Sequence, residues 1–327
     1  MNKFLVFLEQ RGGTIKKASI ETWNRVQELA AEQGDSAVSG ILAGPADLKQ
    51  LDGYIVGDGV IYHASEECLA LYNPERYARL VKDTLQREAC TTLFFADTIL
   101  SRELAPKLSV RLKASLLSGC AMSDVAWHNG GCVRPVYAGS AMASFLPERT
   151  FRIYTISSCA TPAISNARGT ITVITLEPHS FASEPLFSVV RRNLMREGGL
   201  DVAEAGIIVA GGRGMGGTEG FFLLEQLARL LGGAVGASRP VVDEGWRPQC
   251  EQIGQTGKTV APVLYFAFGI SGSLQHLAGI GSVGTVVAIN KDCHAPIFDV
   301  ADYGIVGDVH LVLPKLLDTL QEFLKRK

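Results

Sequence analysis

Short strand-like segments alternate with helix-like segments along the whole chain, and this alternation constrains its fold more than any other feature. In the first half, apolar runs of strand length are expected at residues 4–8, 38–43, 54–56 and 92–95. Helical periodicity is found between and after them, at residues 20–33, 74–88 and 101–112. Because parallel strands need long crossover connections, usually helices, this order predicts an α/β fold with mainly parallel sheets.

The length of 327 residues suits two domains. Segments 133–146, 151–160 and 170–178 resemble a run of paired strands, and strand-like alternation ends at residues 177–185. We therefore expect domains over residues 1–184 and 185–327, each with a mainly parallel sheet flanked by helices.

The second half contains most of the 35 glycines, clustered at strand ends. Strands are expected at residues 207–210, 234–237, 264–268 and 285–289, and a last helix at 311–324. In open α/β sheets, ligands bind at the carboxyl ends of the strands, where glycine lets the backbone approach them closely. A binding site is therefore expected in this half.

Charge and cysteine content exclude several other classes of protein. Lys plus Arg (31) nearly balances Asp plus Glu (33), which argues against nucleic-acid binding. The longest apolar runs fall short of the about 20 residues of a membrane span, and the opening MNKFLVFLEQ is interpreted as a strand. The seven cysteines include no CxxC pair, so neither a disulfide framework nor a metal cage is expected, and the location is predicted to be cytoplasmic.

A glycine-rich turn follows the strand at 207–210 and leads into a helix expected at 218–231. Gly212, Gly214 and Gly217 satisfy GxGxxG, a pattern that can place a pyrophosphate at a helix N-terminus. The acidic residue of a nicotinamide site, expected about 20 positions later, is absent. An alternative remains open, in which these glycines only allow close packing of the helix and strand.

Three further polar segments follow strands or precede them. Segment 253–260 is not a phosphate loop, because Gln252 stands where glycine is required, but its turn exposes Gln255 and Thr256. Segment 267–279 has a Ser-Gly-Ser turn whose serine cap and free N–H groups could bind an anion, followed by a short helix that carries His276. By itself, His276 is more readily explained as an ordinary surface residue of that helix. Asn290 follows the strand at 285–289.

Together these segments resemble the α subunit of electron transfer flavoproteins. The residues that carry the resemblance are GGRG (211–214), ASRPVVDEGW (237–246), IGQTGKTVAP (253–262), GISGSLQHLAG (269–279) and INKDCHAPIFDVADYG (289–304). The first half is also similar, at LAPKLSVRLKASLLS (104–118) and VRPVYAGSAMA (133–143). Segment 151–163 and Cys293 depart from the family pattern.

The resemblance implies a C-terminal, Rossmann-like domain that binds one FAD. It places Arg239 over the isoalloxazine ring. The chemistry of the other residues agrees with FAD: Ser271 could donate to its phosphates, and Asn290 and Asp308 suit its polar adenosine end. Thr256 and His276 could donate to the ring. The full set of implied FAD-binding positions is Arg213, Ser238, Arg239, Ile253, Gly254, Gln255, Thr256, Ser271, Gly272, Ser273, Leu274, Gln275, His276, Asn290, Asp308 and Val309.

The resemblance also implies an electron carrier with no catalytic residue and no metal site, paired with a β subunit as a heterodimer. Such a carrier takes electrons from flavin dehydrogenases, for example the acyl-CoA dehydrogenases of fatty acid β-oxidation, to a quinone oxidoreductase or another reductase. Two alternatives are a flavin- or nicotinamide-dependent oxidoreductase with its own substrate pocket and a non-redox nucleotide-binding assembly module. Neither nucleic acid nor membrane insertion is expected.

Overall fold

The computed structural model describes residues 2–34, 36–51, 54–120, 130–137, 141–157, 169–177, 200–281 and 283–325. These residues form two compact units, which are described one at a time. The predicted domain boundary at residues 184 and 185, and residues 158–163 of the atypical segment 151–163, lie outside the described residues.

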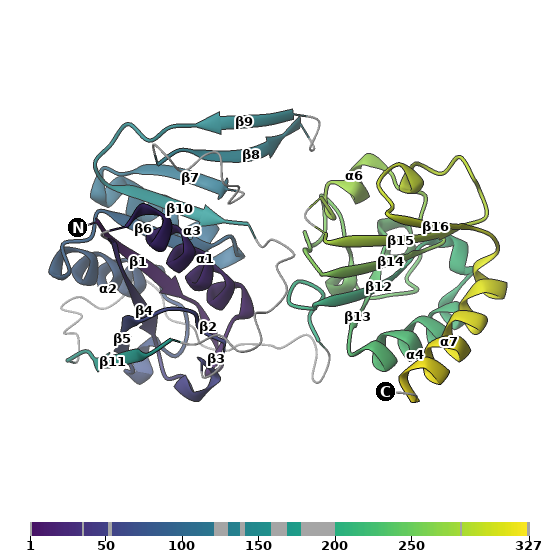
Figure 1. Cartoon of the computed structure of the whole chain (residues 1–327), viewed down its shortest axis with the longest axis horizontal. Helices are drawn as coiled ribbons and strands as arrows, with labels where there is room; N and C mark the ends of the chain where they lie inside the picture. Colours follow the sequence, from purple (N-terminus) through teal and green to yellow (C-terminus); the bar gives the residue numbers. More distant parts are fainter. Residues whose placement is uncertain are drawn as a thin grey trace. The chain divides into compact units, whose positions relative to one another are not determined.

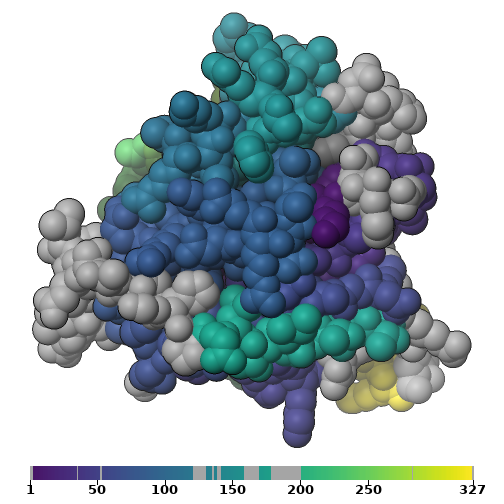
Figure 2. Space-filling view, turned by 90° about the vertical axis from the view of Figure 1, so that its left-hand side faces the viewer, coloured from purple at the N-terminus to yellow at the C-terminus, as the bar shows by residue number. Residues whose placement is uncertain are grey.

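The N-terminal unit is built on a seven-stranded sheet in which every neighbouring pair is parallel (Figure 1). In spatial order the strands are β11 (Ile171–Thr175), β5 (Gly59–Ala64), β4 (Ser36–Ala43), β1 (Asn2–Leu8), β6 (Thr92–Ala96), β10 (Arg152–Ile156) and β7 (Ser115–Cys120). Figure 2 shows β11 as a green band along the exposed edge of this sheet. Two short two-stranded sheets accompany it, β2 (Gln10–Arg11) with β3 (Thr14–Ile15), and β8 (Cys132–Val136) with β9 (Ala141–Phe145).

Three helices cover the two faces of this sheet. Helix α1 (Lys17–Gln33) packs on one face through Trp23 and its neighbours, and α2 (Pro74–Arg87) and α3 (Ile99–Leu112) pack on the other. The start of α2 is fixed by Asn73, whose side chain accepts hydrogen bonds from two backbone N–H groups of the first turn. Thr98 and Ser101 form a capping box at the start of α3. Short 3₁₀ helices lie at η1 (Leu48–Leu51) and η2 (Glu67–Leu69).

The predicted strand at residues 54–56 is wrong. The backbone of this segment bonds to side chains of α1: Trp23 Nε1 donates to the Val56 carbonyl (3.2 Å), and Asn24 binds both the Tyr54 carbonyl and the Val56 N–H. The strand forms instead at β5, which the sequence did not predict. There Gly59 leaves room for Trp23, because a Cβ at this position would lie 2.7 Å from the indole.

The expectation that segments 151–160 and 170–178 pair with their sequence neighbours is also wrong. Strand β10 lies between β6 and β7, and β11 lies beside β5 at the opposite edge. The segment 133–146 does form a local pair, β8 with β9. Contrary to the cysteine argument, Cys120 and Cys132 form a disulfide between the end of β7 and the start of β8.

The C-terminal unit has a five-stranded sheet that is parallel throughout (Figure 1). Its spatial order is β13 (Ala234–Ala237), β12 (Ile207–Gly211), β14 (Leu264–Phe268), β15 (Thr285–Asn290) and β16 (Tyr303–Val306). The first four strands confirm the expected positions. The edge strand β16 was not predicted.

The two faces of the C-terminal sheet are covered differently. Helices α4 (Phe221–Leu231) and α7 (Val309–Lys325) pack side by side on one face (Figure 1). The other face is covered by loops and by the short helix α6 (Leu274–Leu277). The remaining short elements are η5 (Arg213–Met215), η6 (Thr218–Gly220), α5 (Arg239–Asp243), η7 (Gln249–Glu251) and η8 (Pro296–Asp299).

Candidate functional site

The predicted site residues converge on the carboxyl edge of the C-terminal sheet. Strand β12 leads through α4 to β13 on one side, while β14 lies on its other side, so the chain reverses its direction of winding between β12 and β14. Ligands of open α/β sheets bind at such a switch point. Because these strands are parallel, the loops that follow β12, β13, β14 and β15 all begin at this edge.

At the switch point the loops after β12 and β14 touch through their backbones. Gly212 N–H donates to the Phe268 carbonyl (2.8 Å), and Gly214 N–H donates to the Gly269 carbonyl (3.1 Å). A Cβ at Gly212 would lie 2.2 Å from the Gly269 oxygen, and a Cβ at Gly214 would lie 2.7 Å from its Cα. At these two positions glycine is needed for the close packing of two loops, rather than of the helix and strand. Gly217 faces open space, and α4 begins only at Phe221, after a 3₁₀ turn.

The loop after β14 offers a row of backbone donors. The N–H groups of residues 271–275 donate to no acceptor within the part of the chain that the structure describes. Gly272 adopts a φ of +83°, and a Cβ there would lie 2.3 Å from the Ile297 nitrogen, so only glycine lets the loop fold this tightly. Helix α6 is only four residues long, so the individual N–H groups, rather than a helix dipole, make this loop suitable for an anion.

A second polar loop lies against this row of donors. Gln255 N–H donates to the Gln275 carbonyl (2.7 Å), and a Cβ at Gly254 would lie 2.9 Å from the same oxygen. Gln255 and Thr256 are exposed, and the Thr256 hydroxyl accepts a hydrogen bond from Gln252 Nε2 (3.0 Å). The structure thus brings the predicted segments 253–256 and 271–276 together.

His276 is buried rather than on a helix surface, being only 4% exposed. Its Nε2 is hydrogen-bonded to the Tyr265 hydroxyl, with 2.9 Å between the two atoms. Its Nδ1 is buried and forms no hydrogen bond of ordinary geometry among the described residues. Burial lowers the pKa of His276 to about 4. The backbone of Ile253, close enough to interact with the ring as a hydrogen-bond partner, has a smaller effect that raises the pKa. Tyr265 was not among the predicted site residues, although a tyrosine inside an apolar strand signals a buried hydroxyl that needs a partner.

The two predicted arginines are exposed at the same edge. Arg239 is the first residue of α5 and forms an i,i+4 ion pair with Asp243, with 3.4 Å between Nε and Oδ2. Arg213 lies in the turn after β12 and forms no ion pair among the residues described. Ser238 is buried, and its N–H donates to the Gly211 carbonyl (3.0 Å).

Asn290, Asp308 and Val309 already have structural contacts of their own. Asn290 Nδ2 donates to the Ile270 carbonyl (2.9 Å), and its Oδ1 accepts from Asp292 N–H (3.0 Å), which joins the ends of β14 and β15. Asp308 Oδ1 accepts from His310 N–H at the start of α7, and Val309 is buried. These positions shape the edge, and the exposed Asp308 carboxylate keeps one oxygen available to a ligand.

A buried ion pair that the sequence analysis missed supports the segment before the 253–256 loop. Arg247 binds both carboxylate oxygens of Glu251 (2.6 and 3.0 Å) and one oxygen of Glu225 (2.5 Å), and its guanidinium lies over the Phe221 ring. The spacing from Arg247 to Glu251 suits an i,i+4 pair, but nothing in the sequence signals its burial.

In the N-terminal unit, the corresponding edge at the switch point between β1 and β6 is closed by side chains. The Thr98 hydroxyl donates to Glu9 Oε2 (2.5 Å), and Lys16 forms an ion pair with the same carboxylate (3.1 Å). These contacts pair the Lys16 cation with a buried carboxylate, so the cation is not available to a phosphate group. The geometry therefore favours the C-terminal edge as the anion-binding site.

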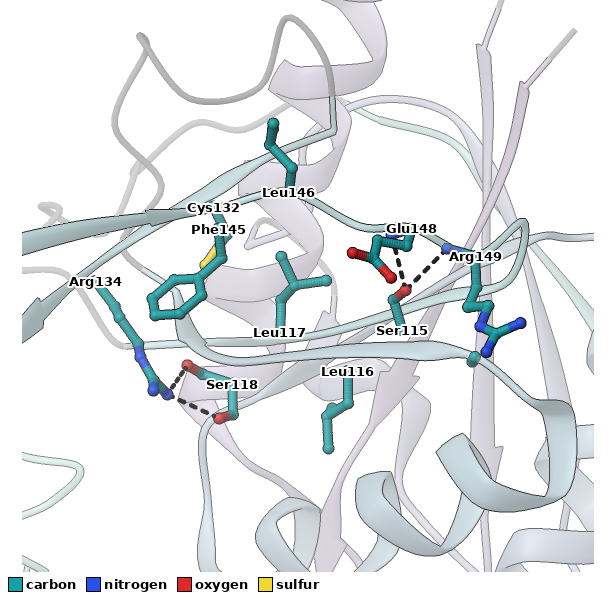
Figure 3. Close-up of a pocket in the computed structure, with 11 residues that line it drawn as sticks. Ser115, Leu116, Leu117, Ser118, Cys132, Arg134, Phe145, Leu146, Glu148 and Arg149 are labelled. Carbon is teal, nitrogen blue, oxygen red and sulfur yellow. Dashed lines mark hydrogen bonds between the residues drawn. The ribbon is translucent and has the colours of Figure 1, made fainter.

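A hollow of about 390 Å³ lies elsewhere in the N-terminal unit, between β7 and the β8–β9 pair (Figure 3). Arg134 stands over the Phe145 ring and donates to both oxygens of Ser118 (3.1 Å each). The Ser115 hydroxyl accepts from the N–H groups of Glu148 and Arg149 (Figure 3). Since these polar groups already bond to one another, the hollow does not contribute to the candidate site.

Comparisons with known proteins match both units. Residues 4–179 match the family described as "Electron transfer flavoprotein domain", and residues 201–281 match "Electron transfer flavoprotein FAD-binding domain". The chain belongs to the electron transfer flavoprotein family. Similar proteins include the α subunits of Thermoanaerobacterium thermosaccharolyticum (35% identical, 97% of both chains) and Bacillus subtilis (34%, 98% of both). The mitochondrial α subunit of Arabidopsis thaliana is 33% identical over 97% of this chain and 89% of its own.

The cofactor of this family's C-terminal domain is FAD, and the site residues suit it. The row of N–H groups at 271–275 provides donors for phosphate oxygens, and the buried Nδ1 of His276 provides a polar atom that still needs a partner. No group of three or more metal-ligating side chains occurs among the described residues. Within the same residues, every helix is too short or too polar to cross a bilayer.

Proposed function

We propose that this chain is the FAD-carrying α subunit of a cytoplasmic, heterodimeric electron carrier that works with a β subunit. It takes electrons from flavin dehydrogenases, such as the acyl-CoA dehydrogenases of fatty acid β-oxidation, and delivers them to a quinone oxidoreductase or another reductase. A relative in Arabidopsis thaliana is mitochondrial, so fractionation of cells is the test of the cytoplasmic location. The observation that carries the proposal is the row of N–H groups at 271–275, which have no acceptor among the described residues, beside the buried His276.

The residues at this edge bind and tune the cofactor and transform no substrate. FAD, when bound, supplies the capacity to accept and release electrons. The 271–275 N–H groups hold its phosphates, while Thr256, His276 and Arg239 favour the added negative charge of the reduced ring. A hydrogen bond to a charged group contributes about 1.5–3 kcal/mol. At about 59 mV per tenfold change for one electron, each such contact shifts a potential by roughly 65–130 mV.

Absorbance of the complex co-expressed with its β subunit tests the binding of FAD. We expect a yellow 1:1 complex with bands near about 380 and 450 nm, the usual flavin bands, and one FAD released per α chain on denaturation. We expect the α chain expressed alone to be poorly soluble or poor in flavin. A colourless complex would contradict the proposal, and an FAD-replete monomer would contradict the role of the β subunit.

The position of Arg239 allows a sharper test of the tuning role. Because its pairing with Asp243 is exposed and therefore weak, the guanidinium is free to turn onto the ring. A planar guanidinium stacks on an aromatic ring better than an ammonium does, so Arg239→Lys should recover only part of what Arg239→Ala loses. We expect Arg239→Ala to lower the flavin potential while FAD stays bound.

Matched variants make the measurement specific. Arg229→Ala removes an exposed arginine from α4, and Asp243→Asn removes the partner of Arg239 without removing Arg239 itself. Neither should lower the potential in a spectroscopic redox titration. A change of less than about 20 mV in Arg239→Ala, well below the 65–130 mV expected for one contact, would show that Arg239 is an ordinary surface residue.

The donor is tested separately by mixing the oxidised complex with an acyl-CoA dehydrogenase and its substrate without oxygen. Loss of the 450 nm band, the flavin band named above, is expected at substoichiometric dehydrogenase. Persistence of the band would refute this donor and leave the FAD assignment standing.

A further inference from the structure

Tyr265, the hydrogen-bond partner of His276, is the strongest feature of the C-terminal unit that the proposed function does not yet use. Tyr265 lies in the central strand β14 and is fully buried, and its hydroxyl has one hydrogen-bond partner within the described residues, His276 Nε2. His276 belongs to the loop after the same strand, where residues 271–276 meet the loop at 253–256. Its Nδ1, at this junction, is buried beside the backbone of Ile253.

The hydrogen-bonding capacity of the two side chains distinguishes the two neutral tautomers of His276. If Nε2 carried the proton, it would donate to the tyrosine oxygen, and both the Tyr265 O–H and the Nδ1 lone pair would be buried without partners. If Nδ1 carries the proton, the Tyr265 O–H donates to Nε2, and the Nδ1 N–H faces the Ile253 backbone, with which it forms no hydrogen bond of ordinary geometry. Because buried unsatisfied groups are costly, the second arrangement is favoured.

Both side chains are also neutral at physiological pH. Burial raises the pKa of the Tyr265 hydroxyl far above the physiological range, so it keeps its proton and remains a donor. Burial lowers the pKa of His276 to about 4, so the ring carries one N–H rather than two. The histidine therefore offers a neutral donor and not a positive charge.

We infer that Tyr265 is a positioning residue that fixes His276 as an Nδ1–H donor toward the bound flavin ring. The inference rests on the proposed function, and it names a partner for His276 outside the set of FAD contacts. A neutral N–H donor stabilises an oxygen that gains charge on reduction without repelling nearby cations. The tyrosine itself does not touch the ring and acts through the imidazole.

The tautomer can be read directly by NMR of the FAD-loaded complex with the β subunit, with ¹⁵N in the histidine rings. The chain has six histidines, and the His276 signals are those lost in His276→Gln. In a neutral imidazole the protonated and unprotonated nitrogens have well-separated ¹⁵N chemical shifts. For His276 we expect a protonated Nδ1 and an unprotonated Nε2. A protonated Nε2 in the wild-type complex would overturn the inference without any variant.

Tyr265→Phe tests the positioning role, because it removes the hydroxyl and keeps the ring. We expect the two His276 nitrogen shifts to converge and the preference of the site for reduced over oxidised FAD to fall about tenfold, about 30 mV for two electrons. Tyr303→Phe, which removes an exposed hydroxyl from β16, should change neither quantity.

A double variant separates positioning from a general loss of structure. In a His276→Gln background the amide can donate without help, so Tyr265→Phe should no longer change the potential. An equal effect in both backgrounds, or unchanged nitrogen shifts in Tyr265→Phe, would overturn the inference. FAD content, measured in every sample, distinguishes these outcomes from failure of the proposed function, which would appear as a complex without flavin.

Discussion

The Arg247–Glu251 pair offers a quantitative test of what holds the cofactor-side loops in place. Side-chain exposure is 11% for Arg247 and 2% for Glu251, so the change Arg247→Met would leave a buried carboxylate without its cation. Breaking a buried pair in this way costs about 3–5 kcal/mol. The second partner, Glu225, is 35% exposed, and its contribution is about 0–1 kcal/mol. We therefore expect the C-terminal unit to lose about 3–5 kcal/mol of unfolding free energy.

The reason for this loss is tested by adding Glu251→Gln to Arg247→Met. The amide is neutral and can keep hydrogen bonds, so removing the stranded charge should restore at least half of the loss. Arg229→Met is the matched control, since Arg229 is exposed in the last turn of α4 and its loss should cost less than about 0.5 kcal/mol.

Native-state hydrogen exchange suits this measurement, because a two-unit chain need not unfold in one step. The slowest amides of β12 and β14 report the C-terminal unit by itself. A loss below about 1 kcal/mol for Arg247→Met, well under the value expected for a buried pair, would refute the reasoning. A double variant no more stable than Arg247→Met would refute it as well.

Two further changes probe the same unit. Gly214→Ala should lower the unfolding free energy by about 1–3 kcal/mol, because its Cβ would lie 2.7 Å from the Gly269 Cα. Gly281→Ala is the control, because no atom lies within 4 Å of its Cβ position. Equal urea midpoints for the two variants would refute the packing role of Gly214. Because the folded pKa of His276, about 4, lies below the ordinary value of 6.5, its contribution to stability is complete above about pH 6.5 and lost as the pH falls toward about 4. His276→Gln should remove about 3 kcal/mol of this pH dependence, and an unchanged difference between pH 7 and pH 4.5 would contradict the assignment.

The strands of the C-terminal unit were predictable where burial leaves an apolar run. Strands β12, β14 and β15 lie inside the sheet and have alternate residues packed on both faces. Strand β16 escaped prediction because it is short, contains Gly304 and is exposed along its whole length. In the N-terminal unit, residues 54–56 have strand-like composition, but side chains of α1 bind their backbone, which no local pattern reveals.

The candidate site, like the fold, was predictable from the sequence only in part. Residues 271–276 were expected at the carboxyl edge because they follow a parallel strand, whereas residues 253–256, which come after α5 and η7, were assigned to the site only by the family resemblance. The contacts made within that edge depend on depth and orientation. Tyr265 reaches His276 because the loop after β14 turns back over its own strand. Arg247, which pairs with the buried Glu251, lies over the Phe221 ring. Neither fact leaves a mark in the local sequence.

The backbone contact between the loops after β12 and β14 has a consequence for redesign of this protein. At Gly212, Gly214 and Gly269 each missing side chain is replaced by main-chain atoms of the opposite loop, so no paired substitution can compensate for a larger residue. A library that varies these positions would return glycine or misfolded protein, whatever ligand is offered. Changes of cofactor potential or preference are better sought at Gln255, Thr256 and Gln275, whose side chains are exposed at the same edge and whose replacement leaves the contact between the two loops intact.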